Sequence, residues 1–274
     1  MQITKNNEGF YVVDAQEVAA TGIREDDVRL LRHHFNCCGC LIVENLFTTE
    51  YIDLLKLAFD KKIEQLTEGD FNKNNYVVGD KRFHITMSLE SPFDDPNLYG
   101  HPLLILLMKM LLGPEVALDS YVAVQSLVGS ANQGLHRDME ALFEDNLTVS
   151  GQLPPYAITV ILPLVDVDQS CGTVLWSESH HNFGYSPVEH PGICPVVRRG
   201  SVYLWDYRLL HLGLANHSQR DRPIISLVYS KPWFMDARNF GKEPPIYMTQ
   251  SQYEKIPAVL KSLFVKLRWT LQSH

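Results

Sequence analysis

The chain has 274 residues, of which 45% are apolar and 20% are charged, and its formal net charge is -8 at pH 7. This composition predicts a globular protein with a sizeable core, and all-β proteins of this length often form one domain. No run of Lys and Arg is long enough for a nucleic-acid or membrane-binding patch, so we expect neither partner. The start of the chain lacks the pattern of a targeting segment, and the apolar stretch 102–112 is too short to span a bilayer, which favours a cytoplasmic protein.

The five cysteines do not form the pattern of a disulfide framework. Cys37, Cys38 and Cys40 are clustered, whereas Cys171 and Cys194 are isolated, and the total is odd. Cys37 and Cys40 form a CxxC pattern, but no second ligand pair accompanies it and an apolar strand follows directly. We interpret these cysteines as small side chains at the start of a strand, in a reducing compartment.

Helical patterns dominate the first part of the chain, which is expected to be helical over about residues 1–112. Apolar spacing predicts helices over residues 25–35 and 51–65, with a short strand over residues 40–43 between them. Residues 66–100 are rich in Asn, Asp, Gly and Pro, which indicates loops with one short strand at 83–87. A further helix over residues 102–112 ends at Gly113.

Strand patterns dominate from about residue 115 to about residue 235. Short turn-rich segments separate the predicted strands, which is typical of antiparallel connections in a jelly roll or barrel. After them the spacing becomes helical again over about residues 249–271, and this helix is expected to pack on the sheet or on a second subunit, so that a homodimer is an open prediction. The predicted strands are residues 117–128, 157–164, 173–176, 201–205 and 224–231.

A short pattern of metal ligands follows the first long predicted strand. His136 and Asp138 are two residues apart, so on an extended segment their side chains point to one face while Arg137 points away. Any other histidine could be the third ligand, and His211 is favoured because it follows a strand and begins a turn. Two imidazoles and one carboxylate leave three positions of an octahedral ion open, which suits iron(II) that must bind a co-substrate and oxygen. In a chain with eleven histidines this triplet alone is a weak signal.

Arg222 strengthens the metal-site interpretation. It follows His211 across a turn, so its guanidinium could lie on the neighbouring strand at the floor of the same pocket. A guanidinium has the fork of donors that binds a carboxylate. If it stood alone, a surface arginine after Arg220 and Asp221 would be the simpler interpretation.

These residues, taken together, resemble the phytanoyl-CoA dioxygenase family of iron(II)- and 2-oxoglutarate-dependent oxygenases. Ser177 and Glu178 replace the family's Pro-Gly pair, and Cys171 replaces its Asn, which concerns the shape of that loop and not the metal site. The similar segments are 36–47 (the entry strand), 133–138 (QGLHRD, similar to QxLHRD), 172–180 (similar to NGxTxxxPGSH), 200–222 (the distal histidine, NxS and arginine block) and 229–236 (YSKPWFMD).

The resemblance implies a mainly β fold with flanking helices, built on a double-stranded β-helix (a cupin-like jelly roll) that forms a single domain over residues 1–274. It implies iron(II) bound by His136, Asp138 and His211, with 2-oxoglutarate and O2 as co-substrates and ascorbate as an optional reductant. Arg222 would bind the distal carboxylate of 2-oxoglutarate. Gln133 and Thr173 would be further contacts to that co-substrate.

The expected reaction oxidises a small organic molecule, by hydroxylation, desaturation or a related step, with release of succinate and CO2. The family's halogenases have Ala or Gly at the position of Asp138, so this chain keeps the carboxylate that they lack. A specialised metabolite is the favoured substrate. The acidic balance disfavours a coenzyme A thioester, although Lys81 and Arg82 could form a basic rim for one.

Five residues are candidate substrate contacts, although core packing explains two of them, Phe143 and Tyr121, equally well. Two functions of other classes stay open: a non-catalytic jelly-roll ligand-binding module, and a metal-dependent hydrolase or isomerase on the same barrel. The candidate contacts are Met139, Phe143, Tyr76, Tyr121 and Gln125.

Overall fold

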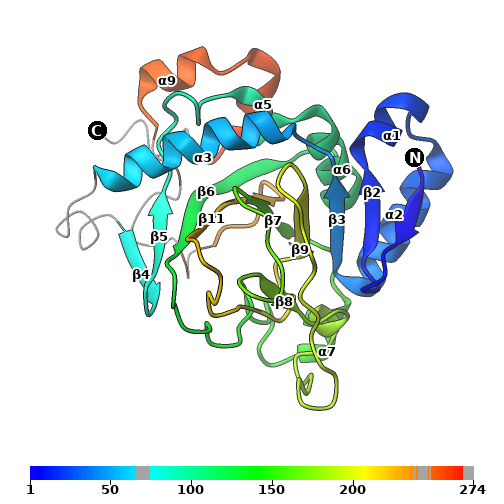
Figure 1. Ribbon diagram of the computed structural model, residues 1–274. Helices are drawn as coiled ribbons and strands as arrows, with labels where there is room; N and C mark the ends of the chain where they lie inside the picture. The colour runs from blue at the N-terminus through cyan, green and yellow to red at the C-terminus, as the bar shows by residue number, and fades with distance from the viewer. Residues whose placement is uncertain (66–74, 237–238, 240–245, 247, 268–274) are drawn as a thin grey trace.

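The computed structural model describes residues 1–65, 75–236, 239, 246 and 248–267 (Figure 1). Its strands form one nine-stranded sheet and one two-stranded sheet. The strands are β1 (Ile3–Lys5), β2 (Tyr11–Asp14), β3 (Cys40–Glu44), β4 (Asn75–Gly79), β5 (Arg82–Thr86), β6 (Ala117–Ser126), β7 (Ala157–Pro163), β8 (Thr173–Leu175), β9 (Val202–Asp206), β10 (His211–Gly213) and β11 (Arg222–Ser230).

The strand order of the large sheet is β1-β2-β3-β9-β7-β11-β6-β5-β4, and β10 pairs with β8 in the small sheet. All neighbouring strands are antiparallel except β2 and β3, which are parallel. The longest pairing joins β11 to β6 and to β7 at the centre of the sheet. Strands that are far apart in the sequence therefore contribute side chains to one continuous surface.

The helices begin and end where the sequence supplies capping groups. The Thr48 hydroxyl accepts a hydrogen bond from the N–H of Tyr51 at 3.2 Å at the start of α3, and Gly39 ends α2 in the left-handed conformation, with φ 75°. The helices are α1 (Ala15–Thr21), α2 (Glu25–Cys38), α3 (Thr49–Glu64), α5 (Pro96–Gly100), α6 (Pro102–Leu112), α7 (Leu147–Gln152) and α9 (Gln250–Lys255), with 3-10 helices η1 (Ser179–His181) and η2 (Ala258–Phe264).

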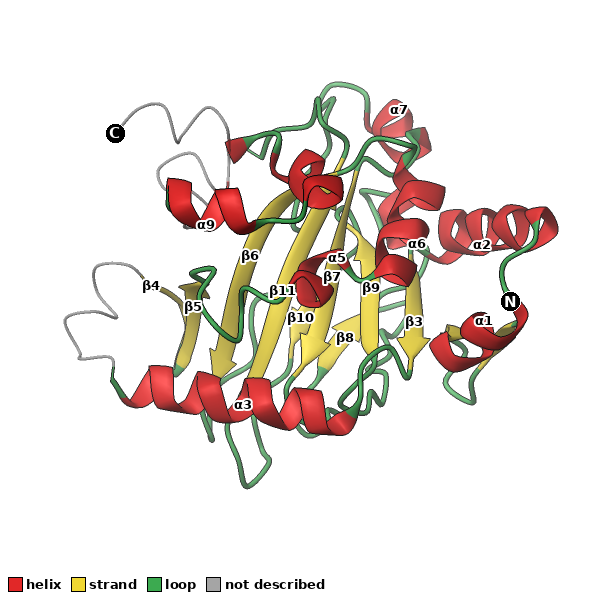
Figure 2. Ribbon diagram, turned by 90° about the horizontal axis from the view of Figure 1, so that it is seen from above, coloured by secondary structure: helices red, strands yellow, loops and turns green. Residues whose placement is uncertain are grey.

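The large sheet has a helix-covered face and a pocket-lining face. Helix α3 runs across the strands in Figure 2, and it buries Ile52, Leu55 and Phe59 in the largest hydrophobic core. Alternate residues of β6 join the same core, among them Tyr121, whereas Ser120 and Val122 line a pocket on the other face. Because successive side chains of a strand point to opposite faces of the sheet, one set of residues packs in the core and the alternate set lines the pocket.

The predicted mainly β fold with flanking helices is confirmed, and the predicted long helices and the strands of residues 115–235 are present within a few residues. The short strand predicted at 83–87 is confirmed as β5, but the first part of the chain is less helical than expected, because β1 and β2 extend the sheet at one edge and β4 extends it at the other. Short edge strands of this kind give little periodic signal. Among the helices of the described residues, none is long and apolar enough to cross a membrane.

The tail differs from the single helix expected over about residues 249–271. The structure has α9 and then the 3-10 helix η2, with Pro257 between them as the residue that precedes η2. Proline has no N–H to donate and fixes its own φ, so a continuous helix is interrupted there. Residues 268–271 of the expected helix lie outside the described residues.

Candidate metal centre and pocket

Three predicted ligands come together between the two sheets. His136 and Asp138 lie in the segment between β6 and α7, and His211 is the first residue of β10. The backbones of His136 and His211 pair directly, with His136 N donating to His211 O at 3.0 Å and His211 N donating to His136 O at 2.9 Å. This bridge fixes two ligands that are far apart in the sequence at adjacent positions.

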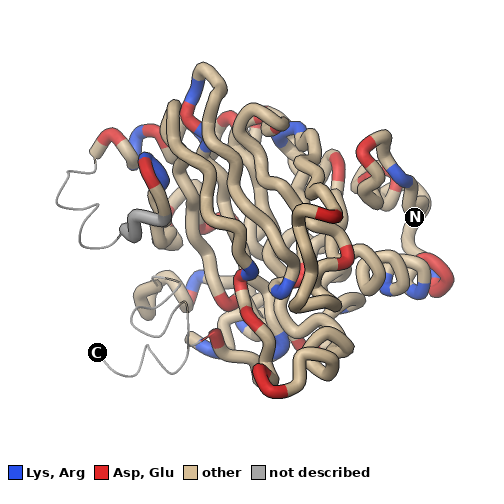
Figure 3. The backbone as a smooth tube through the Cα atoms, turned by 90° about the horizontal axis from the view of Figure 1, so that it is seen from below, with Lys and Arg blue, Asp and Glu red and all other residues tan. Residues whose placement is uncertain are grey.

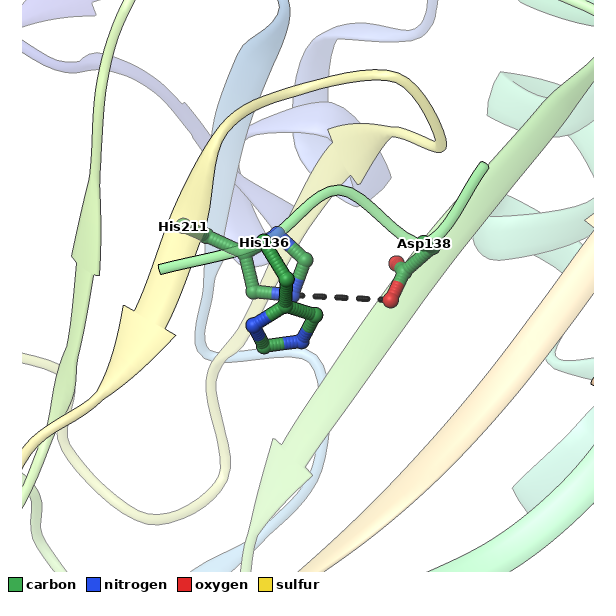
Figure 4. A group of neighbouring side chains, drawn as sticks. All are labelled: His136, Asp138 and His211. Atoms are coloured by element: carbon green, nitrogen blue, oxygen red, sulfur yellow. Dashed lines mark ion pairs between the residues drawn. The ribbon is translucent and has the colours of Figure 1, made fainter. Parts of the chain in front are cut away.

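The side chains of the three residues converge on one point (Figure 4). Their candidate ligand atoms all lie within 4.8 Å of one another, and the pair His211 Nε2 and Asp138 Oδ1 is 3.5 Å apart. The imidazole rings of His136 and His211 have centroids 4.3 Å apart. In the part of the chain that the structure describes, no other group of His, Cys, Asp and Glu meets the same criterion.

Each histidine has one ring nitrogen engaged by the backbone. Nδ1 of His136 donates to Gly134 O at 2.8 Å, and Nδ1 of His211 donates to Leu209 O at 2.9 Å, an assignment of tautomer that follows from the carbonyl acceptors. Nε2 of each ring is then a lone-pair donor for a metal. Burial lowers the pKa of His211, which favours the neutral form that binds metals.

Asp138 also has one oxygen engaged and one directed to the histidines. Its Oδ2 accepts hydrogen bonds from the Thr159 hydroxyl at 2.7 Å and from the Trp205 indole N–H at 3.1 Å. Its Oδ1 is the atom that faces His211. Two imidazole nitrogens and one carboxylate oxygen on one side of a cavity are the donor set of a facial metal site with open positions.

The predicted carboxylate-binding residue Arg222 lines the same pocket as the three ligands, in the part that we call the closed end because His136 and Asp138 are partly exposed whereas Arg222 is not. Its side chain is buried, and its Nε and Nη2 have no hydrogen-bond partner among the described residues. Burial lowers the pKa of Arg222, although a guanidinium stays protonated at any ordinary pH. Buried N–H donors without a partner cost free energy, which an anionic ligand would recover.

A second arginine that was not predicted as a site residue lies beside Arg222. In register, Arg82 of β5 and Arg222 of β11 are both opposite Ser126 of β6, so both side chains lie on the pocket face. Nη2 of Arg82 donates to Leu214 O at 2.7 Å, whereas its Nε and Nη1 have no partner in the described residues. Burial and the charge of Arg222 lower the pKa of Arg82 to about 10. Arg82 therefore cannot belong to a basic rim for coenzyme A.

The predicted co-substrate contacts Gln133 and Thr173 line the same pocket. Gln133 Oε1 accepts a hydrogen bond from Gly213 N at 3.0 Å, and the Thr173 hydroxyl lies 3.1 Å from the Tyr203 hydroxyl. A Cβ atom at Gly213 would lie 2.4 Å from Arg82 Nη1 and from Gln133 Oε1. A side chain at this position would have to displace the ends of the Arg82 and Gln133 side chains, so glycine lets β10 approach both.

The cavity between these groups has a volume of about 310 Å³. Residues of β5, β6, β7 and β11 form much of its walls and combine aliphatic groups with short hydroxyl side chains. Apart from the residues described above, the walls are formed by His84, Thr86, Ser120, Val122, Val124, Ile161, Ile224, Ser226 and Val228, together with Arg137, Tyr207 and Asn239.

The structure gives different positions to the five candidate substrate contacts. Tyr121 and Gln125 point away from the pocket: the Tyr121 hydroxyl donates to Phe93 O at 3.0 Å within the core, and Gln125 donates to Asp221 at 3.3 Å. Their neighbours Ser120, Val122 and Val124 occupy the inward face of this strand instead. Met139 and Phe143 do not line the pocket, and the side chain of Tyr76 on β4 lies outside what the structure describes.

Several residues around the metal position were missed by the sequence analysis. Thr159 and Trp205 contact Asp138, and Asn239 donates from Nδ2 to the backbone oxygen of Asp138 at 2.8 Å. Asn239 is held in turn by Asp236, which also accepts from the Tyr207 hydroxyl at 2.5 Å. No local pattern identifies these residues, because their contacts depend on strand register and on the path of the chain after β11.

The loop in which the sequence departs from the family pattern keeps a defined shape. Glu178 adopts φ 71°, the left-handed conformation that glycine adopts readily, and its N–H donates to Cys38 O at 3.0 Å. Ser179 Oγ accepts a hydrogen bond from Leu210 N at 2.8 Å, next to His211. Arg137, which also lines the pocket, donates from Nη1 to Ser179 O at 2.8 Å and so ties this loop to the metal segment.

Several solved structures share the fold of this chain. One is SnoN, a non-heme α-ketoglutarate-dependent epimerase from nogalamycin biosynthesis, with a TM-score of 0.60 and 15% identity over 84% of this chain and 98% of that one. Another is HygX from Streptomyces hygroscopicus with nickel and 2-oxoglutarate bound (TM-score 0.59, 17% identity, 81% and 92% coverage). A third is AviO1 from Streptomyces viridochromogenes (TM-score 0.58, 20% identity, 78% and 99% coverage). At these identities the likeness concerns the fold, and the predicted jelly roll is confirmed.

The sequence itself matches the family that the motifs resembled. The model of the family described as phytanoyl-CoA dioxygenase (PhyH) matches residues 35–224, a stretch that contains His136, Asp138, His211 and Arg222. The match covers more than half of the chain, so the predicted class, an iron- and 2-oxoglutarate-dependent oxygenase, is confirmed at the level of the family. The chain belongs to the phytanoyl-CoA dioxygenase family.

Proposed function

We propose that this chain is an iron(II)- and 2-oxoglutarate-dependent dioxygenase that oxidises a C–H bond of a small organic molecule. One observation carries the proposal: His136, Asp138 and His211 come together in a pocket that is also lined by Arg222, whose Nε and Nη2 have no partner among the described residues. When bound, iron(II) with 2-oxoglutarate supplies the oxidation by O2, with release of succinate and CO2; ascorbate serves as an optional reductant. The protein supplies binding, orientation and exclusion of water.

The metal ligands are assigned from their free atoms. His136 and His211 would bind iron through Nε2, because Nδ1 of each is engaged by a backbone carbonyl. Asp138 would bind through Oδ1, because Oδ2 already accepts two hydrogen bonds. This donor set holds a hard divalent ion while leaving positions for other ligands, unlike a closed structural zinc site with four protein ligands.

The closed end suits the distal carboxylate of 2-oxoglutarate. Arg222 would bind it through Nε and Nη2, and Arg82 adds a second cation with two unpartnered donors. Thr173 offers a hydroxyl and Gln133 an amide on the side of the small sheet. A carboxylate here would satisfy donors that are buried without partners, so binding is favoured by recovered hydrogen bonds as well as by charge.

The remaining walls suit an uncharged segment of a small molecule. The lining on β6 and β11 alternates valine and isoleucine with Ser120 and Ser226. Charged residues of both signs are scattered over the loops and helices, and the central strands carry few of them (Figure 3). Because Arg82 is buried, only the exposed Lys81 remains of a basic rim for an acyl-CoA thioester, and a specialised metabolite is the substrate class we propose. A specialised metabolite also occurs in the structure of SnoN, an epimerase from nogalamycin biosynthesis, which contains Fe3+, α-ketoglutarate and nogalamycin RO.

The cysteines and the charge of the chain bear on its cellular setting. A cytoplasmic protein is consistent with the five free cysteines, three of which are buried. No nucleic-acid or membrane partner is proposed, because the charge is acidic and no basic patch occurs in the sequence. A homodimer stays a prediction, which sedimentation of the purified chain would test.

Succinate release tests the proposed reaction. The purified chain with iron(II) and 2-oxoglutarate is supplied in air with a panel of metabolites, and we measure succinate, O2 consumption and the mass of each product. The expected result is substrate-stimulated succinate release together with a product that gains an oxygen atom or loses two hydrogen atoms. Turnover that persists with zinc and yields no succinate would support a hydrolase or isomerase, and failure to bind either metal or 2-oxoglutarate would support a ligand-binding module.

A further inference from the structure

The two oxygens of Asp138 have different surroundings. Oδ2 accepts from the Thr159 hydroxyl at 2.7 Å and from the Trp205 indole at 3.1 Å, whereas Oδ1 lies 3.5 Å from His211 Nε2. Asp138 belongs to no helix or strand, and its side chain is 21% exposed. Its orientation is therefore set by the two donors and not by its own segment.

Both donors come from the rigid centre of the large sheet. Thr159 of β7 and Trp205 of β9 are direct partners in register, so their side chains stand next to each other on the pocket face. Both residues are buried. Side chains on paired central strands hold their positions more accurately than those on loops.

Trp205 also contacts a second ligand. Its ring lies against the ring of His211, with centroids 4.8 Å apart and an interplanar angle of 45°. Trp205 thus touches Asp138 through its N–H and His211 through its face. A single buried side chain therefore contacts two ligands, one on β10 and one in the segment between β6 and α7.

We propose that Trp205 and Thr159 are positioning residues that restrict Asp138 to binding the metal through Oδ1 alone. The inference rests on the proposed function. Two imidazoles and one carboxylate oxygen occupy three of six octahedral positions and leave three, whereas a bidentate carboxylate would leave two. A chelating co-substrate fills two positions, so only the first arrangement keeps one free beside it.

The test uses Co(II), an air-stable substitute for iron(II), with variants that remove single donors. Thr159→Val removes the hydroxyl at constant shape, Thr159→Ser keeps a hydroxyl, and Trp205→Phe removes the N–H but keeps a ring against His211. Trp176→Phe is the matched control, because Trp176 is buried but does not line the pocket. The readouts are the Co(II) dissociation constant and the visible spectrum of bound Co(II), which depends on the coordination number.

We expect Thr159→Val and Trp205→Phe to weaken Co(II) binding by about 10- to 100-fold, the range for partners of metal ligands, and to change the spectrum. Thr159→Ser and Trp176→Phe should bind Co(II) like the wild type. If both donor-removing variants keep the wild-type affinity and spectrum, this inference is wrong while the proposed function stands. If the wild type binds no Co(II), the proposed function fails and the inference fails with it.

A metal-free measurement guards against loss of folding. In protein labelled with ¹⁵N-tryptophan, the indole N–H signal of Trp205 is assigned by its disappearance in Trp205→Phe. Asp138→Asn, which weakens the acceptor, should shift this signal and speed its hydrogen exchange while the signal of Trp176 stays unchanged. An unaltered Trp205 signal in this variant would contradict the contact on which the proposal depends.

Discussion

At the metal end of the pocket, each ligand side chain has a hydrogen-bond partner for the atom that faces away from the metal position, whereas at the closed end two arginines have buried donors without partners. The metal end is therefore preorganised before any ligand binds. The closed end becomes satisfied only when an anion arrives. This difference predicts that substitutions at the two ends have separable effects on ligand binding and on the stability of the ligand-free protein.

The largest expected effect is at the metal end. His136→Ala, Asp138→Ala or His211→Ala should each abolish succinate formation. Each should also reduce metal affinity by more than about 100-fold, because loss of a hydrogen-bond partner of a ligand already costs up to about that much and loss of the ligand itself should cost more. Isothermal titration with Co(II) and a coupled succinate assay measure both. Full activity in any of the three would show that the residue is not a ligand.

Arg222→Met sharpens the comparison at the closed end. We expect 2-oxoglutarate affinity to fall by about 30-fold or more, corresponding to about 2 kcal/mol or more for a buried ion contact. The ligand-free protein should be as stable as the wild type or more so, because the variant removes a buried cation with unpartnered donors. Titration with 2-oxoglutarate and urea unfolding of the ligand-free protein measure the two effects.

The matched control for Arg222 is Arg208, which is equally buried but fully paired. Arg208 binds both oxygens of Asp206, from Nε and from Nη2, at 2.8 Å. Arg208→Met leaves that carboxylate buried and unpaired, so unfolding free energy should fall by about 3–5 kcal/mol. Equal losses of stability in the Arg208 and Arg222 variants would contradict the contrast between satisfied and unsatisfied cations.

A smaller effect is expected on lowering the pH. His180 lies in the loop behind the metal end, where Nε2 donates to Asn36 O at 2.9 Å and burial lowers its pKa to about 4. Between pH 6.5 and about 4, His180 binds a proton in the unfolded chain but not in the folded chain. The free energy of unfolding therefore has its full value above this pH range and falls, by up to about 3 kcal/mol, as the pH decreases through it. Urea unfolding at about pH 7 and about pH 4.5 should show a smaller pH effect in His180→Gln. An identical pH effect in the variant would exclude His180 as its source.

The smallest expected effect concerns the loop at Glu178. A non-glycine residue in the left-handed conformation costs about 1 kcal/mol, so Glu178→Gly should stabilise the protein by at most about that amount. Succinate formation should be unchanged, because Glu178 does not line the pocket. A fall in stability would show that the Glu178 side chain makes a stabilising contact that outweighs the backbone cost.

The sequence predicts the metal ligands and Arg222 because they belong to motifs whose residue types and spacing resemble those of the family. Arg82, Thr159 and Trp205 are not predictable in the same way, since their positions in the pocket depend on which strands pair and in which register. A shift of one residue moves a side chain to the other face, which is why Tyr121 and Gln125 were assigned to the pocket instead of Ser120 and Val124. Local sequence patterns therefore predict the helices and strands, whereas the residues that line the pocket depend on how the strands pair in the folded protein.

The most direct test of the central claim is a crystal structure of the chain with Ni(II) and 2-oxoglutarate. We expect the metal at about 2.0–2.2 Å from His136 Nε2, Asp138 Oδ1 and His211 Nε2, distances typical of nitrogen and oxygen ligands. The distal carboxylate of 2-oxoglutarate should accept hydrogen bonds from Nε and Nη2 of Arg222. A metal bound elsewhere, or a 2-oxoglutarate molecule that does not reach Arg222, would contradict the proposed site.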